Sequence, residues 1–273
     1  MRYLRIFTIV FFLGACSLFG WTLHVVSQQD TVIPEIHDSI GELHLHASED
    51  PSSLLEGLTA VDDKDGDLTD QIIIERHSRF TEPGVCRVSY VVFDHSNNFC
   101  RYERTVIYDD YQPPRLHLDM PLLYRTGETI FLLDRFRLYD CIDGDITHKL
   151  KLESSNVPDS TEGIYEIELR ATNNYGHDVW AKVPINIADY SADAPQITLK
   201  QYLVYTKVGQ AVDPLTYVKS VVNSEGAPMS VSDIRFVSQV DLSKSGGGQI
   251  RLEVTDDKGI TGVTYLTVIV EEI

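Results

Sequence analysis

The chain has 273 residues, of which 43% are hydrophobic, so it is long enough for one to three domains and too apolar to be mainly disordered. Its formal net charge of −18 excludes nucleic acid and anionic lipid headgroups as expected partners, because an acidic surface repels both. The cysteines and histidines lack the spacing of a zinc site, so no such site is expected.

The N-terminus predicts a membrane segment. Residues 1–5 contain Arg2 and Arg5, and residues 6–26 form a run of 21 without Asp, Glu, Lys or Arg. As a helix rising about 1.5 Å per residue, this run would span the hydrocarbon core of a bilayer. It also exceeds the ~7–15 apolar residues of a cleaved signal peptide. We therefore expect a single-pass signal anchor, with residues 1–5 cytoplasmic and the C-terminal part outside the cell membrane. Cleavage stays open, as does lipidation at Cys16, because residues 13–16 resemble a lipoprotein signal.

Three similar starts divide the rest of the chain. Pro-Glu-Ile begins at residue 34, Pro-Arg-Leu at 114 and Pro-Gln-Ile at 195, with spacings of 80 and 81 residues. Proline at a first strand position suits a sheet edge because it cannot donate to the ladder. After a linker over 27–33, the predicted repeats are 34–112, 113–193 and a divergent third, 194–273. The joints are short and polar, so we expect neighbouring repeats to sit end to end.

Each repeat ends in the same pattern. Residues 84–94, 163–169 and 248–254 alternate between apolar and polar side chains, and each segment is followed by a turn rich in Asn, Asp or Gly. This pattern predicts antiparallel hairpins. Several short strands in ~80 residues indicate an all-β fold of three tandem immunoglobulin-like β-sandwiches after the transmembrane helix. The predicted inward residues are Cys86, Val88, Tyr90 and Val92 in the first repeat and Tyr165, Ile167 and Leu169 in the second.

An acidic turn marks the first two repeats. The segment Asp-Gly-Asp-Leu-Thr at 65–69 returns 78 residues later as Asp-Gly-Asp-Ile-Thr at 143–147. Together with the Gly-x-Tyr hairpin start and the Asn-Asn turns, this pattern resembles the bacterial surface immunoglobulin-like repeat family, a module also found in a pesticidal crystal toxin and in cell-wall adhesins. The resemblance implies surface exposure and no specific reaction. The third repeat has only Asn-Ser-Glu-Gly at 223–226 where the acidic turn should fall.

The acidic turns are the candidate metal ligands. Calcium takes six to eight oxygen ligands, and carboxylate-rich loops could supply several. The glycine does not follow the ligands as it does in an EF-hand loop, and a β-turn with aspartates that cap backbone amides explains the same residues. We therefore favour a structural turn and keep calcium as the only candidate cofactor. The candidate ligands are Asp62, Asp63, Asp65, Asp67, Asp140, Asp143 and Asp145.

Three other motifs have simpler interpretations. His44 and His46 lie on one face of a predicted strand, but no third metal ligand stands at a recognisable spacing. Asp94-His95-Ser96 are neighbours on one turn, so they cannot converge as a catalytic triad does. Residues 246–248 are three glycines that we expect to form a flexible loop.

Cys86 and Cys100 belong to one predicted hairpin whose apex lies near Asn97. In that hairpin Cys86 should face residue 107 and Cys100 residue 94, which separates the two sulfurs by about 20 Å at ~3.3 Å per residue. That distance is beyond the reach of a disulfide. Free thiols are therefore expected.

These observations predict a non-catalytic, membrane-anchored extracellular stalk or interaction module of the bacterial surface. Its expected partners are the membrane, through residues 6–26, and a surface protein or cell-wall polymer. The alternative is a cell-wall-associated hydrolase or a carbohydrate-binding accessory protein. Tyrosines near the joints fit packing between repeats better than a ligand surface; they are Tyr108, Tyr111, Tyr124, Tyr190, Tyr202 and Tyr205.

Overall fold

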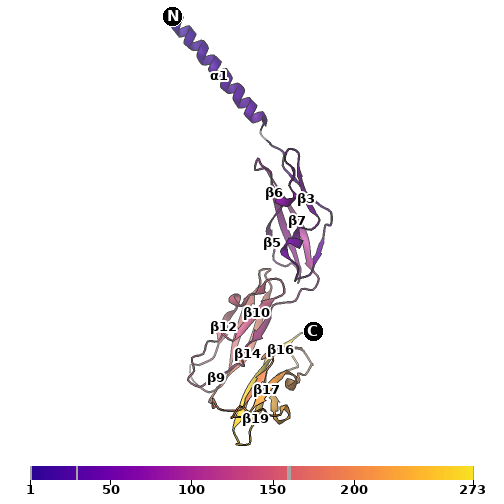
Figure 1. Ribbon diagram of the computed structural model, residues 1–273, viewed down its shortest axis with the longest axis vertical. Helices are drawn as coiled ribbons and strands as arrows, with labels where there is room; N and C mark the ends of the chain where they lie inside the picture. Colours follow the sequence, from indigo (N-terminus) through magenta and orange to yellow (C-terminus); the bar gives the residue numbers. More distant parts are fainter. Residues whose placement is uncertain (1, 29, 159–160, 273) are drawn as a thin grey trace. The chain divides into compact units, whose positions relative to one another are not determined.

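The computed structural model describes residues 2–28, 30–158 and 161–272 (Figure 1). It consists of one long N-terminal helix and many short strands, and the described residues contain no other helix apart from short 3₁₀ turns. The chain divides into two compact units, Met1–Asp109 and Asp110–Ile273. The second unit therefore contains both predicted segments 113–193 and 194–273.

Helix α1 (Arg2–Gln28) contains the predicted membrane segment. Its stretch Ile6–His24 has a mean hydropathy of 2.0 and no side chain buried inside the protein. The helix is long and apolar enough to cross a membrane, as a signal anchor or the apolar part of a signal peptide would be. The exposed phenylalanines and leucines of this stretch need an apolar environment of some kind.

The first unit has two sheets. The smaller has the order β1-β3-β4 and the larger β2-β7-β6-β5, in which only β2 and β7 pair in parallel. Their bounds are β1 Glu35–Asp38, β2 Leu43–Leu45, β3 Leu58–Asp62, β4 Gly66–Asp67, β5 Ile73–His77, β6 Val85–Phe93 and β7 Phe99–Tyr108.

The second unit has four sheets, one smaller and one four-stranded sheet for each of its two segments. The order β11-β10-β8 accompanies β12-β13-β14-β9, and the pair β15-β17 accompanies β16-β20-β19-β18. The first two sheets comprise β8 Arg115–Leu118, β9 Leu123–Arg125, β10 Phe136–Asp140, β11 Gly144–Asp145, β12 Lys151–Ser155, β13 Gly163–Thr172 and β14 Asp178–Ala188. The other two comprise β15 Gln196–Leu199, β16 Leu203–Lys207, β17 Val218–Val222, β18 Arg235–Ser238, β19 Gly246–Thr255 and β20 Thr261–Glu271.

The strand alternation explains the cores. The predicted inward residues of β6 are all buried, and in β13 Ile167 and Leu169 are buried while Tyr165 packs at the edge of the same core. One apolar cluster joins Leu116 and Phe136 to Ile167 across two sheets, and a second joins residues of β15 and β17 to residues of β19 and β20. In the second unit, each four-stranded sheet thus shares its buried face with a smaller sheet.

The hairpin β6–β7 confirms the expectation for the cysteines. Cys86 pairs with Val106 and Cys100 with Val92, one and two residues from the predicted partners. All four cysteines are free, and Cys86 is fully buried. The thiols therefore serve as small apolar side chains or surface groups in this structure.

Within the second unit, the segments 113–193 and 194–273 pack side by side, whereas the short joint predicted an end-to-end arrangement. Strand β19 approaches β14 so closely that a Cβ atom on Gly247 would lie 2.0 Å from the Lys182 carbonyl oxygen. Tyr205 also packs against the core of the preceding segment and accepts a hydrogen bond from the Leu116 amide at 2.7 Å. The glycines at 246–248 belong to β19, so the predicted flexible loop is wrong. Gly247 permits the close contact with β14 because it has no side chain.

Candidate metal centre

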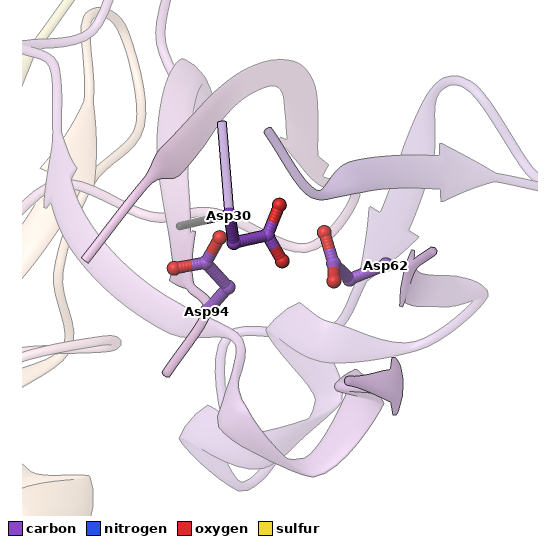
Figure 2. Close-up of side chains that lie close together, drawn as sticks. All are labelled: Asp30, Asp62 and Asp94. Atoms are coloured by element: carbon purple, nitrogen blue, oxygen red, sulfur yellow. The ribbon is translucent and has the colours of Figure 1, made fainter. Parts of the chain in front are cut away.

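Three buried carboxylates from distant parts of the first unit meet at one point (Figure 2). Asp30 follows helix α1 in the chain, Asp62 ends β3, and Asp94 directly follows β6. They offer one oxygen each, and these oxygens all lie within 4.8 Å of one another. Only 8%, 9% and 5% of these residues is exposed, respectively, so water cannot fully solvate the three charges.

The turn after β3 fixes Asp62. Its Oδ1 accepts hydrogen bonds from the amides of Lys64 and Asp65, both at 3.0 Å. Gly66 closes the turn with a φ of +76°, a left-handed conformation that glycine adopts without strain. The aspartate is therefore held by the same local chemistry that makes Asx turns.

The turn after β6 fixes Asp94 in the same manner. Its Oδ1 accepts from the amides of Ser96 at 2.8 Å and Asn98 at 2.7 Å. Asn97 takes a φ of 64°, which asparagine tolerates better than most residues. Both turns thus orient a carboxylate through hydrogen bonds to its Oδ1.

The remaining oxygens of the three aspartates have different hydrogen-bond partners. The Asn98 side-chain amide donates to Asp94 Oδ2 at 2.7 Å and also to the main-chain oxygen of Asp30 at 3.1 Å. Asp30 Oδ1 accepts from the Val32 amide at 3.0 Å. Asp62 Oδ2, in contrast, is buried without any hydrogen-bond partner. A buried charged oxygen in this state is costly and requires an explanation.

Among the described residues, the Lys64 ammonium lies beside the three carboxylates. Lys64 Nζ lies 3.6 Å from Asp30 Oδ1, and the Lys64 side chain is 48% exposed. Three carboxylates and one ammonium leave a formal charge of −2 at this point. The donors are all oxygens, the ligand type of hard cations such as calcium and magnesium.

Of the four acids predicted in the first repeat, the structure brings only Asp62 into the cluster. Asp63 is exposed. Asp65 Oδ2 accepts from the His95 amide at 2.7 Å, and this hydrogen bond is the main reason that the pKa of Asp65 is lowered. Asp67 Oδ1 accepts from the Thr69 amide at 2.9 Å, and hydrogen bonds from Thr69 lower the pKa of Asp67.

The predicted acids of the second repeat accept hydrogen bonds from backbone amides, and two of the three cap their own turn. Asp140 repeats the role of Asp62, since its Oδ1 accepts from the Ile142 and Asp143 amides, both at 2.8 Å. Asp143 Oδ2 accepts from the Asn174 amide at 2.8 Å. Asp145 Oδ1 accepts from the Thr147 amide at 2.9 Å. The turn interpretation accounts for the contacts of Asp140 and Asp145, whereas Asp143 accepts from a residue 31 positions away, in the turn between β13 and β14.

Sequence reasoning missed Asp30 and Asp94 as members of the cluster. Asp94 was assigned to a turn, which is correct, and Asp30 to a linker. A signal did exist in the repeats themselves. The first repeat has Asp at both turn positions, whereas the second has Asp140 with Asn173 and the third has Asn223 with Asp256.

The other candidate motifs form ordinary contacts. His44 Nδ1 lies 2.9 Å from Asp109 Oδ1, and this hydrogen bond raises the pKa of His44. In Asp94-His95-Ser96, the aspartate accepts from the serine main chain, and the imidazole pairs with Asp65 at 3.1 Å. Neither geometry is that of a catalytic relay.

A hollow of about 690 Å³ lies in the second unit, between the two segments that pack side by side. Trp180, which is 52% exposed, lines it together with Glu168, Asp178 and Tyr205. The hollow therefore combines an accessible aromatic ring with carboxylates.

No protein-family model matches the chain. The pesticidal crystal protein Cry22Aa of Bacillus thuringiensis is 28% identical over 211 residues, which is 74% of this chain and 28% of that protein. The chain thus spans less than a third of that relative's length. This weak likeness agrees with the resemblance seen in the repeats, and membership of the repeat family remains a prediction.

Among solved structures, two that match the chain have low identity and low TM-scores. The CBM51-2 and INT domains of Clostridium perfringens ZmpB, in complex with GlcNAc, are 18% identical, with a TM-score of 0.24 over 54% of this chain and 26% of that one. Drosophila N-cadherin EC1-4 is 11% identical, with a TM-score of 0.25 over 84% of this chain and 73% of that one.

Proposed function

We propose that the chain is a non-catalytic, membrane-anchored module of a bacterial cell surface, with three tandem immunoglobulin-like β-sandwiches outside the membrane. The observation that carries this proposal is a helix of membrane-spanning length, α1, followed by one strand order that recurs three times. Arg2 and Arg5 precede the apolar stretch, which favours a cytoplasmic N-terminus.

The polar groups outside helix α1 support a structural role. The histidines and acids that could suggest catalysis are used in turns and ion pairs, as His95 with Asp65 and His44 with Asp109 illustrate. The partner would then be a surface protein or a cell-wall polymer, bound through the folded units. Photocrosslinkers at Tyr111 and Tyr190 on living cells would capture it.

Protease treatment of intact cells tests the topology. The full chain is expressed with a C-terminal epitope; we expect proteinase K to remove the epitope from intact cells and carbonate to leave the protein in the membrane. Intact mass should include residues 1–28. An epitope protected in intact cells would refute the surface location, and release of a chain lacking residues 1–26 would refute the anchor.

The hydrolase alternative has its own test. The full chain in detergent should show no turnover of peptidoglycan above a buffer control. A rate that disappears on one Asp or His substitution would refute the non-catalytic proposal.

A carbohydrate-binding role is a second candidate, favoured by the hollow beside Trp180. An exposed aromatic face with carboxylates nearby suits the apolar face and hydroxyls of a sugar. Sedimentation with purified cell wall tests it: Trp180→Ala should abolish binding, while a matched change at the exposed Trp21 of helix α1, Trp21→Ala, should not. Equal sedimentation of both variants would remove this candidate.

A further inference from the structure

We propose that Asp30, Asp62 and Asp94 bind one divalent cation, calcium in the first place, and that this ion ties the segment after helix α1 to the first β-unit. The proposal goes beyond the surface role and does not depend on it. Nothing in the acidic-turn pattern alone identified this set of ligands.

The unpaired oxygen of Asp62 is the first argument. Asp62 Oδ2 is buried without a hydrogen-bond partner. The Asp62 carboxylate lies beside those of Asp30 and Asp94 (Figure 2), with one oxygen of each residue within 4.8 Å of the others. An unpaired buried charge costs several kcal/mol in general, and nearby like charges add to that cost. A bound cation would supply the missing partner for all three groups at once.

The second repeat is an internal comparison at the same place. Asp140 holds the position of Asp62, and Asn173 holds that of Asp94. The Asn173 side-chain amide donates to Asp140 Oδ2 at 3.0 Å, and its Oδ1 accepts from the His177 amide at 2.8 Å. A neutral side chain therefore fills the partner role that is vacant in the first repeat.

In the third repeat, different residues form the corresponding hydrogen bonds. Asn223 replaces the first aspartate and caps the amides of Glu225 and Ala227 at 3.0 and 2.8 Å. Asp256 keeps the second aspartate, and its Oδ2 accepts from the Ser224 hydroxyl at 2.6 Å. Within the described residues, a group of three close carboxylates occurs in the first repeat, where Asp30 joins Asp62 and Asp94.

Charge and donor type select the ion. Three carboxylates with Lys64 at 3.6 Å leave a formal −2, which one divalent cation neutralises. The donors are oxygens throughout, which favours a hard ion over zinc or copper. Calcium accepts irregular oxygen shells completed by water or main-chain oxygens, whereas magnesium demands near-octahedral geometry.

The ion would also act on the joint that follows helix α1. Asp30 already contacts the β6–β7 turn through the hydrogen bond from Asn98 to its main-chain oxygen. Its side chain accepts from the Val32 amide. A cation shared with Asp62 and Asp94 would add a second tie across the same joint, so binding should slow exchange of the Val32 amide hydrogen.

Calorimetric titration of the full chain in detergent, stripped with EDTA, tests binding. With CaCl₂ as the probe we expect one saturable site per chain, with a Kd of about 10⁻⁴–10⁻³ M as in extracellular calcium modules. The melting temperature should rise with calcium, and MgCl₂ should compete weakly.

Matched variants identify the ligands. Asp94→Asn reproduces the pair found in the second repeat, so it should fold without calcium and lose saturable binding. Asp62→Asn reproduces the residue of the third repeat and should also lose it. Asp63→Asn removes the same charge from an exposed neighbour and should bind as the wild type does.

Three results would overturn the proposal. The first is no saturable heat for the wild type at calcium up to about 10 mM, ten times the weakest class of extracellular site. The second is unchanged binding by both Asp94→Asn and Asp62→Asn. The third, calcium binding that leaves exchange at Val32 unaltered, would overturn the tie to the joint.

Discussion

Arg104 of β7 is the most buried charge in the described part of the chain, and its removal gives the sharpest stability prediction. Its side chain is 0% exposed. The guanidinium donates to the main-chain oxygens of Leu54 at 2.6 Å and Glu56 at 2.7 Å, and lies 3.5 Å from Asp38 Oδ1. It also lies over the Tyr90 ring, 5.3 Å from the centroid.

The substitution Arg104→Met keeps an apolar stem of similar reach and removes the charge. Two carbonyl oxygens lose donors, each worth about 1.5–3 kcal/mol when the donor is charged. Asp38 keeps hydrogen bonds from Ile40, Gly41 and Tyr102, so its carboxylate still has hydrogen-bond donors. We expect a loss of about 3–6 kcal/mol in the free energy of unfolding of the first unit, because two hydrogen bonds from a charged donor are lost.

The loss of Arg104 should also change how the stability of the first unit depends on pH. Burial alone would raise the pKa of Asp38, but hydrogen bonds from Gly41, Ile40 and Tyr102 and the charge of Arg104 together lower it. A carboxyl whose pKa is lowered in the fold stabilises the fold at pH values above its ordinary pKa of 3.8. This stabilisation is lost as the pH falls through the folded-state pKa. In Arg104→Met that pKa should rise, so acid unfolding should begin at a higher pH.

Urea unfolding of the full chain in detergent measures both effects, with hydrogen exchange in β6 and β7 reporting the first unit. Arg101→Met is the matched control, because the ion pair of Arg101 with Glu75 is largely exposed. Its transition should scarcely move. A loss below about 1 kcal/mol for Arg104→Met, within the ordinary range for surface positions, would refute the reasoning.

Three further predictions concern single positions. Gly247→Ala places a Cβ atom 2.0 Å from the Lys182 carbonyl oxygen, so it should destabilise the second unit by about 1–3 kcal/mol in urea, as overpacking does; an unchanged midpoint would contradict the close packing of β14 and β19. In Gly144→Ala the new Cβ atom meets no atom within 4 Å, so only the backbone φ of +70° opposes the change, and the free energy of unfolding should fall by about 1–2 kcal/mol. Gly144→Asn should lower it less, and equal losses for the two variants would argue against backbone strain. Burial raises the pKa of the Cys86 thiol to about 11, so iodoacetamide at pH 8 should modify the exposed Cys141 before Cys86, as peptide mass spectrometry would show; modification of Cys86 before Cys141 would mean that the first unit opens.

The hairpins show which features the alternation of apolar and polar residues predicts and which it does not. Alternation along 84–94 correctly identified the buried face of β6, because a strand puts every second side chain on the same side. The pairing was one to two residues off, since the sequence does not specify which residues form the apex of the turn. The glycines at 246–248 were misassigned for a related reason: glycine signals a loop locally, and only the strand beside it shows that its lack of a side chain is needed.

The sequence by itself determined the local features of this protein: the apolar helix, the repeated strand pattern, the acidic turns and the free thiols. These follow from interactions between residues a few positions apart, which composition and spacing record. Only the tertiary structure decided which aspartates meet, because Asp30, Asp62 and Asp94 are spaced 32 residues apart and are brought together by two sheets and a linker. It also decided the side-by-side packing of the last two segments, which depends on the fit between two strand surfaces that no local pattern records.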